Sequence, residues 1–169
     1  MKLRSWMAAL SLTATVALSA CATAHTSQLP TLASLQSAAA SEPKDAHAAS
    51  ALALGELVLA GGDNHRAQLA LIQARKLTPT APDLLFAQGL LADIHGQPSA
   101  ALDAYIATIE QAVATRAPAA SLLVEVASYA VLGQVGLARG FAETVRSRLT
   151  PLMAAPQLSL AARAALVDV

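Results

Sequence analysis

The sequence contains few aromatic residues, little charge and a single cysteine. Aromatic residues make up 3% of its 169 residues and charged residues 13%, the latter about half of the share in an average globular protein. The formal net charge is zero and no block of like charge occurs. This excludes the basic patch expected of a nucleic-acid-binding protein and a basic tail for lipid headgroups. One cysteine excludes an intramolecular disulfide bond.

The sequence also lacks the motifs that carry common enzyme chemistry. No Gly-x-Ser-x-Gly nucleophile elbow occurs, and neither does a phosphate-binding Gly-x-x-x-x-Gly-Lys or Gly-x-Gly-x-x-Gly pattern. No two histidines have the i, i+4 spacing of a helical zinc site; they are His25, His47, His65 and His95. We therefore expect no catalytic residue, no metal site, no cofactor and no small-molecule substrate, and predict that the protein is not an enzyme.

The first 21 residues have the pattern of an export signal. Lys2 and Arg4 precede an apolar stretch from Trp6 to Leu18, which is shorter than the roughly 20 residues of a membrane-spanning helix. The next residues, Leu18-Ser19-Ala20-Cys21, resemble the lipobox of bacterial lipoproteins. The resemblance implies removal of a signal peptide at 1–20, a diacylglycerol on Cys21 and an acyl chain on its new amine. The alternative is an ordinary secretory signal with a chance cysteine.

Location and spacing follow from the residues after Cys21. Ala22, where an Asp is the usual inner-membrane retention signal, implies by resemblance a lipid-anchored protein on the periplasmic face of the outer membrane. Residues 21–45 are rich in Ala, Thr, Ser and Gln and contain Pro30 and Pro43. This composition predicts a flexible tether between the anchor and the folded domain.

The remaining chain has an internal repeat. Four pairs of residues recur 34 residues apart: Gly55 and Gly89, Gly62 and Gly96, Ala67 and Ala101, and Leu71 and Tyr105. The abundance of Ala predicts a core of closely approaching helices, because Ala is the best helix former and adds little volume. A period of this length is typical of stacked helix pairs.

The period and these residues resemble the tetratricopeptide repeat (TPR). The residues that carry the resemblance are Gly55, Gly62, Ala67 and Pro79 in one unit and Gly89, Gly96, Ala101 and Tyr105 in the next. The Trp and Tyr usual in the first helix of each unit are absent. A third unit follows at an offset of 37, with Gly133, Ala138 and Ala142. In this family the first glycine allows a close helix crossing and the second allows the turn between helices.

The fold implied by the resemblance is all-α. We expect a short right-handed TPR-like α-solenoid of about three helix pairs within 46–151, at about 48–81, 82–115 and 119–151. Pro82, Pro98 and Pro118 fit the first turns of helices, and Pro79 and Pro151 fit positions just beyond helix ends. Residues 157–167 are predicted to form a C-terminal capping helix.

The concave face of such a solenoid is where we expect function. The family's groove positions fall on Leu52, Glu56, Leu59, Phe86, Leu90, Asp93, Ile94, Leu123 and Ala127. An apolar floor with isolated carboxylates suits an amphipathic or extended segment with a basic residue or two. The alternative is that these side chains pack inside a shallow bundle.

The expected function is a membrane-anchored periplasmic TPR scaffold that binds another envelope protein in an assembly or secretion complex. Two alternatives remain. The chain is the N-terminal docking segment of a larger exported enzyme, or it is a structural envelope lipoprotein that self-associates through its apolar terminal helix.

Overall fold

The computed structural model describes residues 30–62, 65–115, 120–137, 140–156, 158 and 160–167. All regular secondary structure in these ranges is helical, which confirms the all-α prediction. The elements are α2 (Leu32–Ser41), α3 (Ala46–Leu59), α4 (His65–Leu77), α5 (Pro82–Ile94), α6 (Pro98–Thr115), α7 (Ala120–Leu137), α8 (Phe141–Leu149), the 3₁₀ helix η1 (Thr150–Ala154) and α9 (Leu160–Val167). The predicted signal peptide and Cys21 lie outside the described residues.

Glycine and proline set the helix boundaries as predicted for the first two pairs. Gly62 and Gly96 have φ values of 119° and 67°, in the left-handed region that glycine enters without a Cβ clash. Each lies in the turn between the two helices of a pair. Pro82 and Pro98 are the first residues of α5 and α6, where the missing N–H has no partner to lose.

The third pair departs from the prediction. Gly133 was expected in a turn, but it lies inside α7, which continues to Leu137. The chain reverses further on, and Gly140 precedes α8 with a φ of 103°. Glycine in a helix interior only weakens the helix, whereas a left-handed turn position strongly prefers glycine. The glycine that marks the turn is therefore Gly140, and the 37-residue offset placed it too early.

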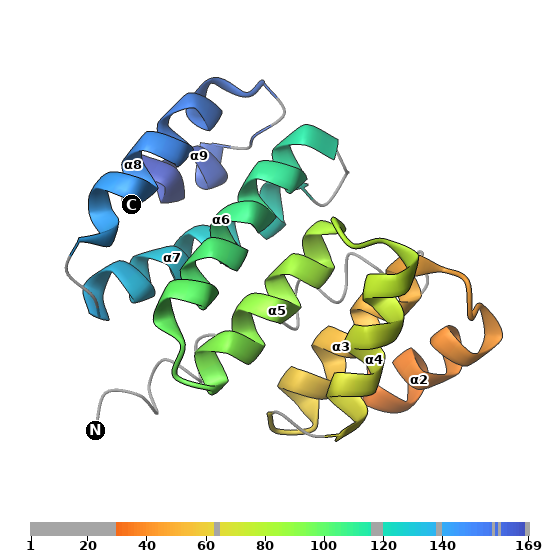
Figure 1. The fold of residues 1–169 in the computed structure, drawn as a ribbon. Helices are drawn as coiled ribbons and strands as arrows, with labels where there is room; N and C mark the ends of the chain where they lie inside the picture. Colours follow the sequence, from red (N-terminus) through yellow and green to blue (C-terminus); the bar gives the residue numbers. More distant parts are fainter. Residues whose placement is uncertain are drawn as a thin grey trace.

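The helices stack side by side along the molecule (Figure 1). α3 packs against α4, and α5 packs against α6. α3 also lies along α5, and α6 packs against α7. α7 and α8 make little contact, and α9 packs on α7 instead. The first two pairs thus have the expected partners, whereas α7 and α8 do not form a third pair of the same kind.

The centre of the second pair is a glycine–aromatic contact. A Cβ on Gly89 of α5 would lie 2.6 Å from Cδ1 and 3.1 Å from Cζ of Tyr105 on α6, so only glycine leaves room for the ring. Tyr105 and Phe86 are fully buried, with their ring centroids 5.5 Å apart. The sequence contains little other aromatic volume, so this contact fills the space that the many alanines leave.

The segment predicted as a flexible tether contains an ordered helix. α2 begins after Thr31, whose hydroxyl accepts a hydrogen bond from Ser34 N, and Ser34 Oγ in turn accepts one from Thr31 N. Leu35 is buried and packs directly on Gly55 of α3. The tether prediction is therefore wrong for 32–41. The three-residue spacing of Leu29, Leu32 and Leu35 indicated no more than a transient helical turn, whereas the structure places Leu32 and Leu35 beside Gly55.

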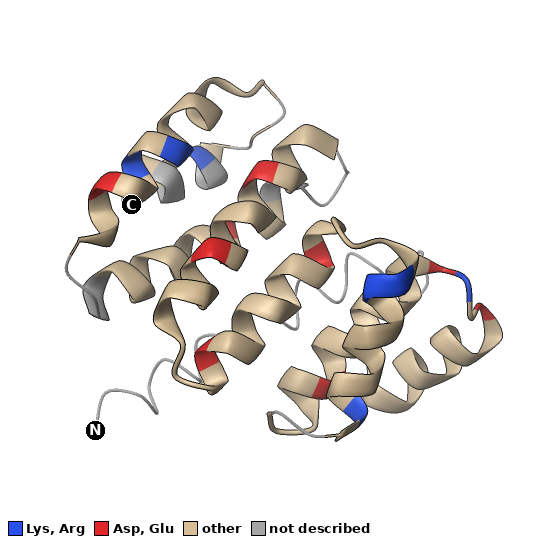
Figure 2. Ribbon diagram, in the orientation of Figure 1, with Lys and Arg blue, Asp and Glu red and all other residues tan. Residues whose placement is uncertain are grey.

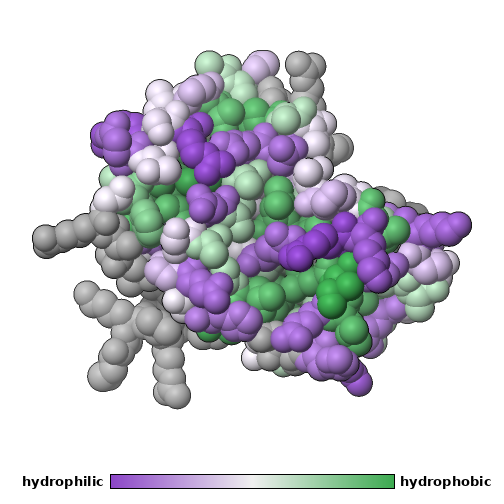
Figure 3. Space-filling model, viewed as in Figure 1, coloured by the Kyte–Doolittle hydropathy of each residue, from purple (hydrophilic) through white to green (hydrophobic). Residues whose placement is uncertain are grey.

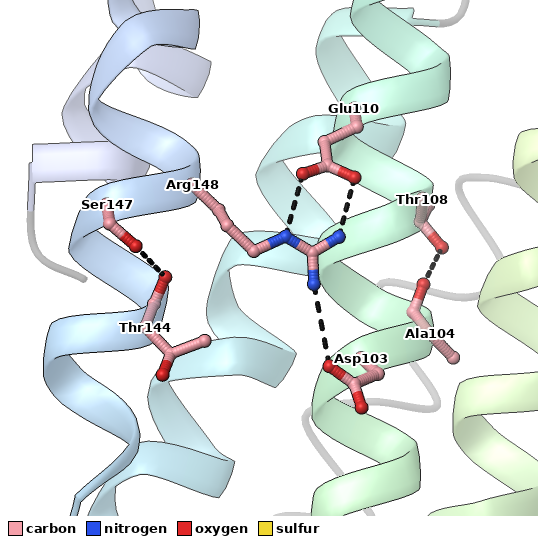
Figure 4. A network of polar contacts seen from close by, with 7 residues as sticks. All are labelled: Asp103, Ala104, Thr108, Glu110, Thr144, Ser147 and Arg148. Carbon is pink, nitrogen blue, oxygen red and sulfur yellow. Dashed lines mark hydrogen bonds and ion pairs between the residues drawn. The ribbon is translucent and has the colours of Figure 1, made fainter.

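An arginine joins α8 to α6 (Figure 4). Arg148 Nε and Nη2 donate to the two carboxylate oxygens of Glu110 at 2.9 and 2.7 Å, and Nη1 lies 3.5 Å from Asp103 Oδ1. This bidentate geometry suits a guanidinium and a carboxylate. The hydrogen bond and negative charge of Glu110 raise the pKa of Arg148. Together with buried Val145 and Leu149, the pair holds α8 on the preceding helices.

Candidate functional site

Several of the residues predicted to line a groove are interior. Phe86 and Ala127 are fully buried, and Leu90 and Leu123 are nearly so. Their side chains contribute to the core between helices and present no surface to a partner. At these four positions the structure agrees with the alternative interpretation, in which the side chains pack inside a shallow bundle.

Glu56 is also covered, by the chain's own α2. Only 2% of Glu56 is exposed, and its Oε1 accepts a hydrogen bond of 2.9 Å from Gln36 Nε2. Glu56 Oε2 is buried and has no hydrogen-bond partner. The predicted central charge of the first unit is thus an internal contact between α2 and α3.

The other predicted groove residues remain at the surface. Leu59 and Ile94 are exposed, and Leu52 and Asp93 are partly exposed. We call these four residues the α3–α5 surface. They lie on two neighbouring helices, α3 and α5, that pack along each other.

A polar contact aligns these two helices. His47 Nδ1 lies 2.9 Å from Asp83 Oδ2, and these are the second residues of α3 and α5. Since both helices start at this contact, pack together and have similar lengths, their C-terminal ends lie at the same edge of the molecule (Figure 1). Leu59 and Ile94 occupy those ends. The arrangement therefore puts two exposed aliphatic side chains at the same edge of the molecule, and Asp93 directly precedes Ile94 in the chain.

Asp93 also influences the buried tyrosine. Burial, and to a smaller degree the negative charge of Asp93, raise the pKa of Tyr105 well above its ordinary value. The Tyr105 hydroxyl is buried without a hydrogen-bond partner of good geometry. The aromatic ring therefore fills space in the core, and the hydroxyl stays protonated at all physiological pH values.

A second exposed apolar surface, on α4, was not predicted from the sequence. Leu69 is 53% and Ile72 50% exposed, and both project from the side of α4 opposite its buried residues. Figure 3 shows hydrophobic surface over this helix, next to hydrophilic side chains. The available signal was the pattern of α4 itself. Apolar residues occur on both sides of this helix, more than its contact with α3 requires.

The terminal helix exposes a third set of apolar side chains. Leu160 is 86% exposed, and Val167, seven residues later and on the same face of α9, is also exposed. A helix, α9, occupies Leu160–Val167 within the range 157–167 where a capping helix was predicted. Within the part of that helix whose side chains are described, its outer face is not the polar face usual for a cap.

The described residues, 30–62, 65–115, 120–137, 140–156, 158 and 160–167, contain neither a metal-binding cluster nor a helix that could span a membrane. In these ranges, no group of three or more His, Cys, Asp or Glu side chains is placed to hold a metal ion. None of the helices there is both long and apolar enough to cross a membrane.

Comparisons with protein-family models, with curated proteins and with solved structures gave no match. The functional interpretation therefore depends on the residues and surfaces described above.

Proposed function

We propose that this protein is a lipid-anchored scaffold of the bacterial envelope whose stacked helices bind a segment of another envelope protein. The lipobox-like Leu18-Ser19-Ala20-Cys21 supports the anchor. The packing of α3 with α4 and of α5 with α6 supports a binding role, because stacked helix pairs present extended surfaces to partners.

One observation carries the proposal. Leu59 and Ile94 are large aliphatic side chains left exposed on adjacent helices that are otherwise rich in buried residues. Aliphatic side chains grouped at a surface mark interaction sites more often than isolated ones do. With Asp93 beside them, they suit the apolar side of a partner helix or extended segment that also carries a Lys or Arg.

In-cell photo-crosslinking tests this proposal. A photoreactive residue is introduced at Leu59 or Ile94, with Ala142, exposed on α8, as the control position. We expect the same envelope protein to be captured from Leu59 and Ile94 but not from Ala142. Capture should be lost with Asp93→Lys, which repels the basic residue of the partner. Equal capture from all three positions, or capture that Asp93→Lys does not reduce, would contradict the proposal.

A specific observation also favours a second candidate, self-association through α9. Leu160 has the greatest exposure of any large hydrophobic side chain in the described residues. A second copy of the chain that covers this helix would remove the apolar surface from water. Crosslinking from Leu160 should then capture the protein itself, and a Leu160→Glu variant should remain monomeric. Monomers at every concentration of the parent protein would exclude this candidate.

A further inference from the structure

The exposed side of α4 combines aliphatic and basic side chains. We call it the basic–apolar face, made of Arg66, Leu69, Ile72, Arg75 and Lys76. Residues three and four apart on a helix are neighbours, so Arg66 lies next to Leu69, and Ile72 lies next to Arg75 and Lys76. The two aliphatic side chains are therefore bordered by cations at both ends of the helix.

The opposite side of α4 accounts for its packing in the fold. Ala67, Leu71 and Ala74 are buried against the rest of the domain. Leu69 and Ile72 are half-exposed and are not needed for that contact. Figure 3 shows the hydrophobic surface over α4 on the face that Figure 1 presents to the viewer. The basic–apolar face is thus free to contact something outside the domain.

No ion pair within the described part of the chain compensates the charges on this face. α4 contains no Asp or Glu, and none of its three cations forms an ion pair with any residue that the structure describes. By contrast, Arg146 and Arg148 on α8 are both paired with carboxylates. Figure 2 shows basic residues on α4, whereas α5 and α6 carry only acidic ones.

Of the three carboxylates on α3 and α5, the helices packed against α4, Asp93 lies near Tyr105 of α6 and the other two have polar partners. Glu56 on α3 accepts a hydrogen bond from Gln36, and Asp83 on α5 contacts His47. Asp45 accepts a hydrogen bond from the backbone N–H of His47 as the cap of α3. Among the described residues, no carboxylate pairs with the cations of the basic–apolar face, so these cations are available to a negative ligand.

We propose that this face docks on a bilayer surface that contains anionic phospholipid. Aliphatic side chains flanked by Lys and Arg are the chemistry by which a helix lies in the headgroup region: the apolar groups enter the acyl boundary and the cations bind phosphates. Each Lys or Arg near an anionic surface adds to the attraction. Arg66, Arg75 and Lys76 surround Leu69 and Ile72 in this way.

The position of the anchor supports this occupant, and in this respect the inference rests on the proposed lipidation of Cys21. Cys21 and Leu32 are 11 positions apart in the chain, a length that spans at most about 40 Å even when fully extended. Anchoring holds the domain within this distance of the bilayer and raises the effective concentration of lipid at α4. Gln73 Nε2 of α4 donates to Pro43 O at 3.2 Å, which fixes α4 to the segment leading from α2.

Quenching of an indole by brominated lipid tests the docking. The single tryptophan of the sequence is Trp6, which lies in the predicted signal peptide, so Ile72→Trp provides the mature protein with one indole on the basic–apolar face. Tyr129→Trp is the matched control, because Tyr129 has nearly the same exposure but lies on α7. The purified full-length lipoprotein is reconstituted in vesicles of phosphatidylcholine, with or without phosphatidylglycerol.

We expect strong quenching at position 72, only in the vesicles with phosphatidylglycerol, and little quenching at position 129. Each of the substitutions Arg66→Gln, Arg75→Gln and Lys76→Gln should lower the equilibrium constant for docking about fivefold, as expected for the loss of one cation at an anionic surface. High salt should also lower this equilibrium constant, because it screens the attraction between the cations and the lipid surface. Equal quenching at the two positions, or quenching unaffected by the charge substitutions, would overturn the inference.

Two further outcomes separate this inference from the proposed function. Mass spectrometry of the reconstituted protein reports whether Cys21 is acylated. Charge-dependent quenching at position 72 in a protein without acyl groups would support the docking and refute the anchor. If position 72 is unquenched by lipid but shielded from a soluble quencher by an acidic envelope protein, the face binds protein and the inference is wrong.

Discussion

The substitution Gly89→Ala tests the packing at the centre of the second helix pair. In an exposed helix, this change stabilises by up to about 1 kcal/mol, because Gly costs backbone entropy that Ala does not. Here the added Cβ would lie 2.6 Å from Cδ1 of Tyr105 and 3.1 Å from its Cζ. The ring is fully buried and cannot swing into solvent. Overpacking of this kind costs about 1–3 kcal/mol, so we expect a net loss of about 1–2 kcal/mol in the free energy of unfolding.

Gly55→Ala is the matched control. At this position the added Cβ meets Cδ1 of Leu35, the end of a flexible side chain on α2. Leu35 is able to change rotamer, so the cost falls on the contact between α2 and α3 and not on the central core. We expect a net change below about 1 kcal/mol, because the gain in helix propensity offsets part of the strain.

Urea unfolding of the full chain in mild detergent, followed by circular dichroism, measures both changes. The midpoint should fall more for Gly89→Ala than for Gly55→Ala, with the same slope. In a double-mutant cycle, Tyr105→Leu should relieve the strain of Gly89→Ala, giving a coupling energy of about 1 kcal/mol or more. A Gly89→Ala variant as stable as the parent, or a cycle without coupling, would refute this account of the helix contact.

Three further predictions concern the polar groups of the fold. Tyr105→Phe should leave the free energy of unfolding unchanged or higher at neutral pH. Above pH 10, urea unfolding should show that the parent loses about 1.4 kcal/mol per pH unit relative to the variant. The reason is that the raised pKa keeps Tyr105 protonated in the folded state while the unfolded state ionises. Arg148→Met should lower the free energy of unfolding by about 1 kcal/mol, less in high salt, since the pair with Glu110 is one-third exposed. Gln36→Ala leaves buried Glu56 without its partner, so hydrogen exchange should accelerate in α2 but not in α6.

The sequence was sufficient for the helix pairs where local signals are strong. Pro82 and Pro98 begin helices and Gly62 and Gly96 occupy left-handed turns, because these residues restrict the backbone wherever they occur. The close approach at Gly89 was also predicted, and Tyr105 is its partner. These features depend on neighbours within one repeat, which is the distance over which a sequence pattern is informative.

Features that depend on packing between distant segments were not predictable in this way. The segment before residue 45 has only three large apolar residues after Cys21, Leu29, Leu32 and Leu35, and only the fold reveals that Leu35 has Gly55 to pack against. Gly133 resembles a turn glycine, but α7 continues through this position. The whole helix α7 packs on α6 and α9. The predicted groove residues also differ in exposure because of packing between distant segments. Phe86 faces Tyr105 in the core, whereas Ile94, near the end of the same helix, is exposed.

Attachment to the membrane is the central claim, since the proposed scaffold role depends on it and the proposed docking of α4 is favoured by it. Its most direct measurement is tandem mass spectrometry of the N-terminal peptide of the protein isolated from membranes. The account predicts a chain that begins at Cys21, carries a diacylglycerol on its sulfur and has an acylated amine. A free Cys21 thiol, a different cleavage site or an uncleaved N-terminus would contradict it.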